Sequence, residues 1–404
     1  MKVGVIGGGA AGMAAAYFSA IRGNDVFLIE KNEKLGKKIY ITGKGRCNLT
    51  NLCEPEDFLQ NVVTNPKFVY ASIYGFTPQD AVDFFNGLGL KTKVERGNRV
   101  FPESDKSSDV IKTLASAISS VGVDVKLNES VKKITVNCGA VKSIITDKAE
   151  YFCDRVIVAT GGLSYPSTGS TGDGYAFAES VGHTVTELLP SLTGLELYGK
   201  DFLPLMGLTL KNAGVSVYNG EKRIYFKQGE ALFTHYGISG PTVLSASSII
   251  NTVKSDDFTL KIDLKPALSY ETLSARVLRD FNLNINKEIK NSLDALLPKS
   301  LIPLVIKRAG IPEYKKPNSI THNERDNLVF TLKNLDFKIK GTRGFNEAVI
   351  TRGGVCVKEI NPKNMESKLV KGLRFCGEVL DVDAFTGGFN LQIAFSTGKA
   401  AAND

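Results

Sequence analysis

The feature that most constrains the fold of this chain is a glycine-rich turn near its start. A short apolar run over residues 2–6 is followed at once by Gly7-Gly8-Gly9-Ala10-Ala11-Gly12 and then by an alanine-rich segment. This spacing, G-x-G-x-x-G between a strand and a helix, is typical of a Rossmann unit that binds a dinucleotide. Gly7 permits the tight turn, Gly9 lets the backbone approach a pyrophosphate, and Gly12 lets the helix pack closely on the strand.

A second predicted strand, residues 26–29, ends at Glu30. A carboxylate at this place accepts hydrogen bonds from the ribose hydroxyls of an adenosine. A glycine-rich turn that binds no ligand is the alternative. The complete order of strand, turn, helix, strand and glutamate favours the dinucleotide.

The bulk composition is that of an ordinary soluble globular protein. The 404 residues are enough for two or three domains, and 43% are hydrophobic and 23% charged. The first strand begins at residue 2, so no signal peptide is expected, and the apolar stretch 10–21 is too short to span a bilayer. Six cysteines without C-x-x-C spacing and three histidines argue against zinc or iron–sulfur ligation and favour the cytoplasm.

Three later segments favour FAD over NAD. Residues 155–162 form a buried-strand pattern that ends in Ala-Thr-Gly-Gly, as where two-domain flavoproteins return to the nucleotide domain. Residues 372–381 resemble a last strand whose acidic residue, here Glu378, holds the ribityl chain. The turn Gly387-Gly388 opens a helix whose N-terminus would stabilise a negative charge near the flavin N1–C2=O edge.

No second G-x-G-x-x-G follows a strand elsewhere in the sequence. A transient electron donor such as NAD(P)H would therefore have to dock directly against the flavin, without a Rossmann fingerprint of its own.

The segment 36–51 carries a resemblance to a known family. It reads G-K-K-x-x-x-T-G-x-G-R-C-N-x-T-N and resembles the signature of the BaiN/RdsA-type FAD-dependent oxidoreductases, which include the aminoacetone oxidases. The resemblance continues through residues 99–102, 161–174, 229–241 and 377–390. Ala384 and Phe389 depart from it, because glycine and tyrosine are expected there.

The resemblance implies an α/β fold with a Rossmann-type FAD-binding domain built from both chain ends, and with β-rich and helical domains inserted. We expect domains at 1–189, 190–266, 267–341 and 342–404, the first and last forming the FAD domain. Independent patterns agree: Asn219-Gly220 is a strong hairpin signal, and Thr321 and Glu324 form a capping box.

Many groups are expected to contact FAD, from the glycine turn, the signature and the later segments. They are Gly7, Gly9, Ala10, Ala11, Gly12, Glu30, Lys31, Lys38, Thr42, Arg46, Cys47, Asn48, Val131, Ala159, Thr160, Gly161, Gly162, Gly377, Glu378, Gly387, Gly388, Phe389 and Asn390. Within the signature, Arg46 and the lysines could neutralise the pyrophosphate. A solvated basic loop is the alternative.

Two residues are candidate catalytic groups. Cys47 follows Arg46, which should lower the pKa of its thiol and suit it as a proton donor beside the flavin. Reduction of a C=C bond needs such a donor, although a thiol that only packs against the ring is the alternative. His235 stands at the end of a predicted strand, as an acid, a substrate anchor or a structural group. No metal site is expected.

Charge is concentrated in the predicted helical domain. Residues 267–341 hold 13 Lys and Arg against 8 Asp and Glu, a net +5 of the chain's total of +8. Such a surface could contact ribosomal RNA, or it could be a solvated helical face.

The resemblance implies two activities. One is NAD(P)H-dependent reduction of the uracil C5–C6 bond in large-subunit ribosomal RNA, which the basic insert favours. The other is oxidation of a small amine such as aminoacetone, with release of peroxide. A third hypothesis is an RNA-binding assembly factor with vestigial flavin chemistry. The sequence leaves the substrate, the choice of NADH or NADPH and the oligomeric state open.

Overall fold

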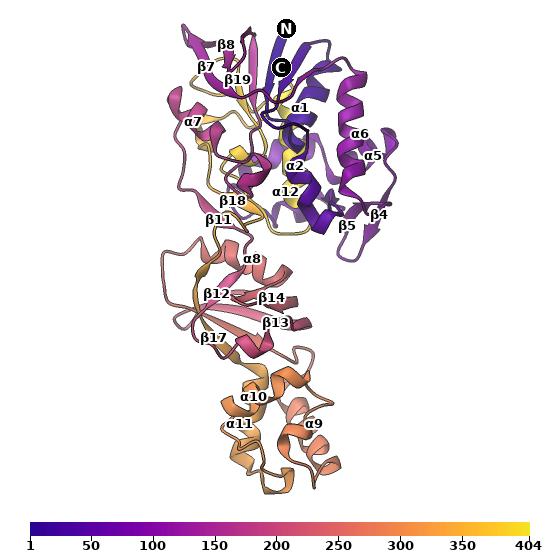
Figure 1. The fold of residues 1–404 in the computed structure, drawn as a ribbon, viewed down its shortest axis with the longest axis vertical. Coiled ribbons are helices and arrows are strands. Elements are labelled where there is room, and N and C mark those ends of the chain that lie inside the picture. The colour runs from indigo at the N-terminus through magenta and orange to yellow at the C-terminus, as the bar shows by residue number, and fades with distance from the viewer. The chain divides into compact units, whose positions relative to one another are not determined.

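The computed structural model describes residues 1–404 and divides into two compact units. The first unit combines residues 1–191 with 344–404, and the second is residues 192–343 (Figure 1). Each unit has its own cluster of buried apolar side chains. The first unit therefore takes residues from both ends of the chain.

A five-stranded parallel sheet forms the centre of the first unit, in the order β19-β10-β1-β2-β6. Its strands are β1 (Lys2–Ile6), β2 (Asp25–Ile29), β6 (Asp124–Lys126), β10 (Arg155–Val158) and β19 (Leu373–Phe375). Strand β19 comes from the C-terminal part and pairs with β10, which in turn pairs with β1. This confirms the predicted Rossmann-type fold built from both chain ends.

Two helices, α1 (Ala10–Ala20) and α12 (Phe389–Ala401), pack against each other beside this sheet (Figure 1). Their approach is close, because a Cβ at Gly398 of α12 would lie 2.6 Å from the carbonyl oxygen of Ala11. An antiparallel sheet of β7 (Val131–Asn137), β8 (Ala140–Thr146) and β9 (Glu150–Phe152) packs near β1, where Ile144 fills the space beside Gly4.

The remaining elements of the first unit surround this core. A small antiparallel sheet has the order β3-β5-β4, and β11 pairs with β18. These elements are β3 (Thr50–Asn51), β4 (Thr92–Glu95), β5 (Arg99–Pro102), β11 (Leu189–Ser191), β18 (Ile350–Arg352), α2 (Lys37–Ile41), α3 (Pro55–Leu59), α4 (Pro66–Gly75), α5 (Pro78–Gly87), α6 (Ser107–Ser120) and α7 (Asp173–Ser180).

The second unit contains a closed β-barrel in the order β12-β15-β14-β13-β16-β17. Its elements are β12 (Leu195–Leu197), β13 (Thr209–Asn219), β14 (Lys222–Phe233), β15 (Gly237–Ser239), β16 (Phe258–Asp263), β17 (Leu335–Thr342), α8 (Pro241–Ile250), α9 (Tyr270–Leu283), α10 (Ile302–Arg308) and α11 (His322–Lys333). The predicted hairpin at Asn219-Gly220 joins β13 to β14, and the predicted capping box opens α11.

Barrel and helices of the second unit share one apolar core, which contains Val215 of β13 together with Val277 of α9 and Leu328 of α11. The predicted division of this part of the chain near residue 266 stays a prediction. None of the helices has the length and apolar character needed to cross a bilayer.

Candidate cofactor site

The glycine turn after β1 contains two glycines that the fold itself requires, Gly7 and Gly12, and one that it does not, Gly9. Gly7 has a φ of +105°, and a Cβ on Gly12 would lie 1.8 Å from the carbonyl oxygen of Gly7. Gly9 differs from both, because its φ is −83° and a Cβ there would meet no atom within 4 Å. The protein itself leaves this space empty, as a close approach of a pyrophosphate requires.

The N-termini of α1 and α12 both lack a side-chain cap. Gly9 and Gly388 occupy the cap positions, and neither helix has an acidic residue in its first turn. The first amides of a helix have no intrahelical acceptor and carry partial positive charge. The Ala10 and Ala11 amides of α1 are therefore suited to phosphate oxygens, and those of α12 to a second electron-rich group.

Glu30 follows β2 and is buried beside the glycine turn. Its carboxylate accepts hydrogen bonds from the Gly8 amide at 2.7 Å and from the Asn32 amide at 2.8 Å. Val131, another predicted FAD contact, is the first residue of β7. Two residues before it, the Glu129 amide donates to the Glu30 carbonyl. The carboxylate is thus fixed at the end of β2, where the sequence predicts the ribose.

Two lysines of the predicted set form ion pairs. Lys31 Nζ lies 2.6 Å from Asp173, and Lys38 Nζ lies 2.6 Å from Glu378. Glu378 also accepts the Thr351 amide at 2.8 Å. The expected ribityl-binding carboxylate is therefore held between the signature segment and β18.

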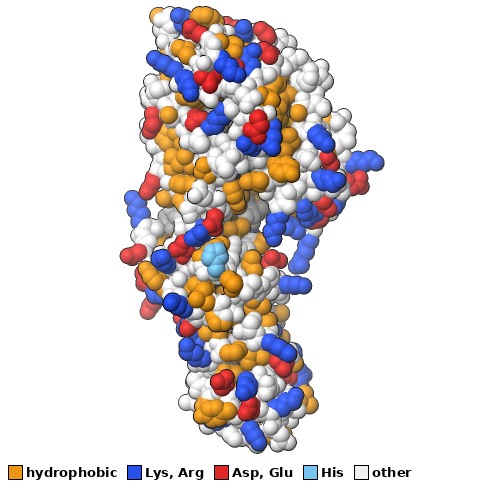
Figure 2. All heavy atoms as spheres, in the orientation of Figure 1, with side chains coloured by type: hydrophobic (Ala, Val, Ile, Leu, Met, Phe, Trp, Pro, Cys, Tyr) orange, Lys and Arg blue, Asp and Glu red, His pale blue; other side chains and the backbone are white.

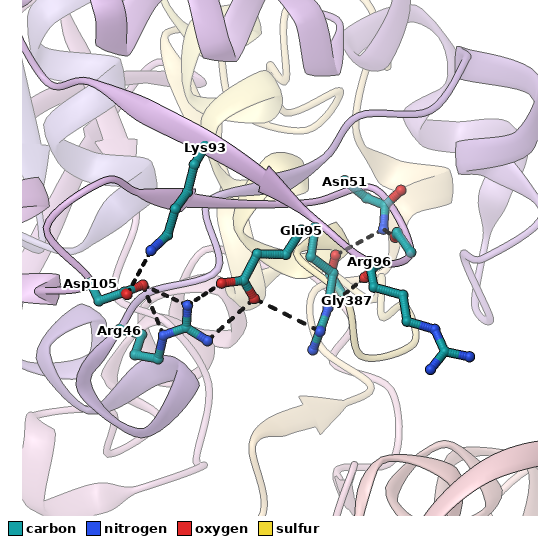
Figure 3. Close-up of polar contacts among 9 residues, drawn as sticks. Arg46, Asn51, Lys93, Glu95, Arg96, Asp105 and Gly387 are labelled. Carbon is teal, nitrogen blue, oxygen red and sulfur yellow. Dashed lines mark hydrogen bonds and ion pairs between the residues drawn. The ribbon is translucent and has the colours of Figure 1, made fainter. Parts of the chain in front are cut away.

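Arg46 is engaged differently from the prediction. Its Nε donates to Asp105 at 2.9 Å, and its other nitrogens donate to both Glu95 and Asp105 (Figure 3). Its guanidinium also lies 4.2 Å from the Phe101 ring centroid. Lys93 Nζ completes the network at 2.6 Å from Asp105. These contacts lower the pKa of both carboxyls. Its contact with pyrophosphate stays a prediction, and in this structure carboxylates occupy its donors.

Cys47 also differs from its prediction. Its side chain is fully buried, and this burial raises the thiol pKa to about 12, where the sequence led us to expect a lowered pKa. Arg46 cannot lower the pKa of this thiol effectively, since two carboxylates neutralise the guanidinium. Thr42, at the start of the same loop, donates its hydroxyl to the Ile39 carbonyl.

Left-handed backbone conformations shape the loop that contains these residues. Gly43, Lys44, Gly45 and Cys47 all have positive φ. The loop leads to Asn48, whose buried Oδ1 has no hydrogen-bond partner. Such an orphaned acceptor is costly unless a ligand or a water donates to it.

Asn51 ties the signature segment to the C-terminal turn (Figure 3). Its Nδ2 donates to the carbonyls of Gly97, at 3.0 Å, and Gly387, at 3.2 Å. Gly388 packs against the same segment, because a Cβ there would lie 2.4 Å from the Thr50 carbonyl. After this turn, the ring of Phe389 packs edge-on against Phe58, with 5.1 Å between the ring centroids.

The strand-to-loop segment after β10 completes the site. The carbonyl of Ala159 would lie 2.6 Å from a Cβ on Gly7, and Thr160 Oγ1 is buried without a partner. A Cβ on Gly162 would approach the Glu378 carboxylate to 3.0 Å. Other predicted groups lie nearby or support the C-terminal turn. Gly161 has a φ of +74°, and a Cβ on Gly377 would lie 2.6 Å from the Cβ of Ala11. The Asn390 side chain donates to the Ala384 carbonyl at 2.8 Å.

His235 is the predicted site residue that lies in the second unit. It is exposed in the turn between β14 and β15. Its ring packs edge-on against the ring of Tyr236, with 5.0 Å between the ring centroids. Its catalytic role stays a prediction.

Sequence reasoning missed two carboxyls beside the C-terminal turn: Asp381, which is half-buried, and Asp383, which is buried. Asp381 accepts the Asn65 side chain at 3.2 Å, and Asp383 accepts the Ser191 hydroxyl at 3.2 Å. Burial raises the pKa of both, and Asp383 Oδ1 has no partner. The spacing Asp-x-Asp within the C-terminal motif was the signal that could have found them.

These observations fit FAD. The empty space at Gly9, the uncapped ends of α1 and α12, and the orphaned oxygens of Asn48 and Thr160 are all features that a bound dinucleotide would satisfy.

Comparisons with known proteins show what the whole chain is similar to. The family model described as "HI0933-like protein Rossmann domain" matches residues 1–404. The 3-dehydro-bile acid delta(4,6)-reductase of Clostridium scindens is 32% identical, over 99% of this chain and 98% of its own. Ribosomal RNA dihydrouridine synthases of Escherichia coli and Haemophilus influenzae are 31% and 33% identical, over 99% and 98% of this chain and 96% of theirs.

A solved structure shows the same fold. The 3-ketosteroid-delta4-(5alpha)-dehydrogenase of Rhodococcus jostii RHA1 aligns with a TM-score of 0.54 at 16% identity, covering 100% of this chain and 97% of its own. At this identity the likeness concerns the fold alone.

Proposed function

The chain belongs to the HI0933-like family of FAD-dependent oxidoreductases, and from this premise we propose that it reduces the C5–C6 bond of a uridine in large-subunit ribosomal RNA with NAD(P)H. The observation that carries the proposal is the likeness, over almost the full chain, to two relatives named ribosomal RNA dihydrouridine synthase. Dihydrouridine differs from uridine by two hydrogens on this bond.

A second candidate is reduction of a C=C bond in a steroid-like molecule. The relative named as a bile acid reductase is as similar to this chain as the two RNA enzymes are, at 32% identity. Both candidates share one reaction type, which is addition of a hydride to one carbon and a proton to its neighbour. Neither oxidation of a small amine nor a role in assembly without redox chemistry uses this reaction.

Bound FAD would supply the hydride for this reaction. The protein's own groups would bind and orient the cofactor: the amides at the start of α1 hold the pyrophosphate, and Glu30 holds the adenosine ribose. Lys38 and Glu378 would position the ribityl chain, and the uncapped start of α12 would stabilise negative charge on the ring.

A proton donor is also required, and Cys47 remains our candidate. With a pKa of about 12 the thiol is protonated at neutral pH, so it can hold a proton but is not a nucleophile. Because its side chain is buried, it can act only on an atom that packs directly against its loop. Cys47→Ala should lower turnover at unchanged FAD content, and undiminished turnover would remove it from the mechanism.

The structure gives the basic helical segment less weight as an RNA contact. Several of its cations already have acidic partners: Lys307 and Arg308 pair with Asp201, and Lys315 pairs with Glu324. Figure 2 shows Lys, Arg, Asp and Glu side chains mixed over the helices α9–α11. A ribosomal RNA substrate would place the protein in the cytoplasm.

The proposal is tested by incubating the purified, FAD-loaded protein with NADH or NADPH and ribosomal RNA from cells that lack it. Mass spectrometry of the large-subunit RNA should find one new dihydrouridine. Unchanged RNA would contradict the proposal. Consumption of a 3-oxo steroid alkene would then support the second candidate, and peroxide release from aminoacetone would support the oxidase.

A further inference from the structure

One outer face of the barrel carries aromatic and basic side chains next to each other. Val215 and Val217 of β13 are buried in the barrel core, so the alternating residues Ser216 and Tyr218 point outward. Ser216 lies opposite Phe226 on the neighbouring strand β14 and opposite Lys261 on the other neighbour, β16. Small Ser216 thus sits between a ring and a cation.

Phe226 rests against the sheet with much of its ring uncovered. Its side chain is 54% exposed, and a Cβ on Gly214 would lie 3.3 Å from its Cε2. The absence of a side chain at Gly214 therefore lets the ring lie against the strand. A single exposed ring is common on protein surfaces, and Phe226 differs in having a second ring and two cations beside it.

A cation accompanies each of the two rings. The guanidinium of Arg223 lies 5.4 Å from the Phe226 ring centroid, and Lys261 Nζ lies 4.6 Å from the Tyr218 centroid. We call these residues together with Ser216 the aromatic–cationic face.

One carboxyl borders this face: Asp263 of β16 lies opposite Gly214, and it pairs with Lys333 at 2.6 Å. Arg223 and Lys261 form no ion pair, and neither do the exposed Lys211 and Lys222 on the same hairpin. The cations of the helical segment differ, because most of them are paired, as Lys315 is with Glu324. The cations beside Phe226 and Tyr218 therefore form no ion pair, whereas most cations of the helical segment do.

We propose that the aromatic–cationic face binds single-stranded RNA, with bases stacked on Phe226 and Tyr218 and phosphates bound by Arg223 and Lys261. Every base has a flat face that can stack on an aromatic ring, and unpaired cations attract the phosphate backbone. The proposal rests on the proposed function, since it names the surface that holds the RNA substrate. An acidic protein partner would also match the positive charge, but it would not use the flat face of the Phe226 ring for stacking.

The test measures binding of a fluorescein-labelled single-stranded RNA of about 12 nucleotides to the FAD-loaded protein by anisotropy. Phe226→Ala should weaken binding about five- to hundredfold, the usual effect of losing one stacked base. Phe226→Trp should keep the affinity, because it keeps the stacking surface. Phe330→Ala is the matched control, since Phe330 is 57% exposed on α11, and its affinity should equal that of the unaltered protein.

The charge contribution is tested through the salt dependence of binding. Arg223→Ala should reduce the slope of log affinity against log salt by about 0.7, as expected for one lost phosphate contact. Lys148→Ala, which removes an exposed cation without an ion pair in the first unit, should leave the slope unchanged.

Equal RNA affinity of the Phe226→Ala and Phe330→Ala proteins, both with normal FAD absorbance, would overturn the proposal. This outcome is distinct from failure of the proposed function. If no dihydrouridine forms but Phe226→Ala still weakens RNA binding selectively, the aromatic–cationic face is supported as an RNA-binding surface and the proposed reductase activity is contradicted. If both variants form dihydrouridine with the same KM for RNA, the reductase activity is supported and the RNA-binding role of this face is contradicted.

Discussion

Gly9 is the residue at which ligand binding and folding can be separated. An alanine at this position has an allowed φ of −83° and meets no atom of the protein within 4 Å. We predict that Gly9→Ala folds with an unchanged melting temperature but binds FAD at least about tenfold more weakly, because its methyl group occupies the phosphate space.

Gly87→Ala is the control for this change, since a Cβ at the end of α5 also meets nothing within 4 Å. Flavin fluorescence during titration reports the affinity. An FAD affinity of Gly9→Ala equal to that of Gly87→Ala would place the pyrophosphate elsewhere.

Arg46 acts through the Glu95 and Asp105 carboxylates, and this can be distinguished from phosphate binding. We predict that Arg46→Ala and Glu95→Gln both speed hydrogen exchange of the amides in residues 42–48, by about five- to tenfold, because each change releases the loop from the β4–β5 hairpin. Hydrogen exchange with mass spectrometry measures this. If Arg46 instead bound phosphate, Glu95→Gln would free it and tighten FAD binding.

The prediction of a lowered pKa for Cys47 is wrong because the surroundings of Arg46 and of the thiol depend on the fold. The pattern Arg-Cys places a cation beside a thiol along the chain, but Glu95 and Asp105 lie 49 and 59 residues away in sequence. Only the fold brings them to Arg46. The roles of Gly7 and Gly12 could be predicted, since their constraints arise within the turn itself.

At the scale of elements, a buried histidine links α7 to the C-terminal segment. His183 lies just after α7, and its ring nitrogens contact Glu359 at 2.9 Å and Ser367 at 2.7 Å. Burial lowers its pKa below the ordinary value of 6.5, an effect that Glu359 partly opposes. As the pH falls below about 6.5, the unfolded chain therefore binds a proton before the folded protein does.

We predict that the free energy of unfolding falls between about pH 7 and pH 5, and that His183→Gln makes this fall smaller. The change is measured by urea unfolding at each pH. A His183→Gln profile as steep as the unaltered one would show that other groups cause the loss.

Elements with a local signature were the predictable ones. The first strand–turn–helix unit, the hairpin at Asn219-Gly220 and the capping box at Thr321 all follow from neighbouring residues. The closed barrel could not be predicted, because it depends on pairing of β12 with β17 across more than a hundred residues of sequence. The outward aromatic–cationic face was hidden for the same reason.

At the scale of the whole molecule, net charge gave an incomplete guide to partners. The excess of +5 over residues 267–341 is real, but the fold pairs many of these cations with carboxylates, some from outside that segment, such as Asp201 and Glu196. On the barrel, Arg223 and Lys261 lie beside aromatic rings and form no ion pair. A partner is better inferred from which charges remain unpaired than from their sum.

The central claim is that this FAD oxidoreductase reduces a uridine of ribosomal RNA. The most direct measurement is mass spectrometry of large-subunit RNA from three strains: one lacking the protein, one supplied again with it, and one supplied with its Gly9→Ala variant. We predict that one dihydrouridine is absent from the first, restored in the second and reduced in the third. An identical set of dihydrouridines in all three would contradict the claim.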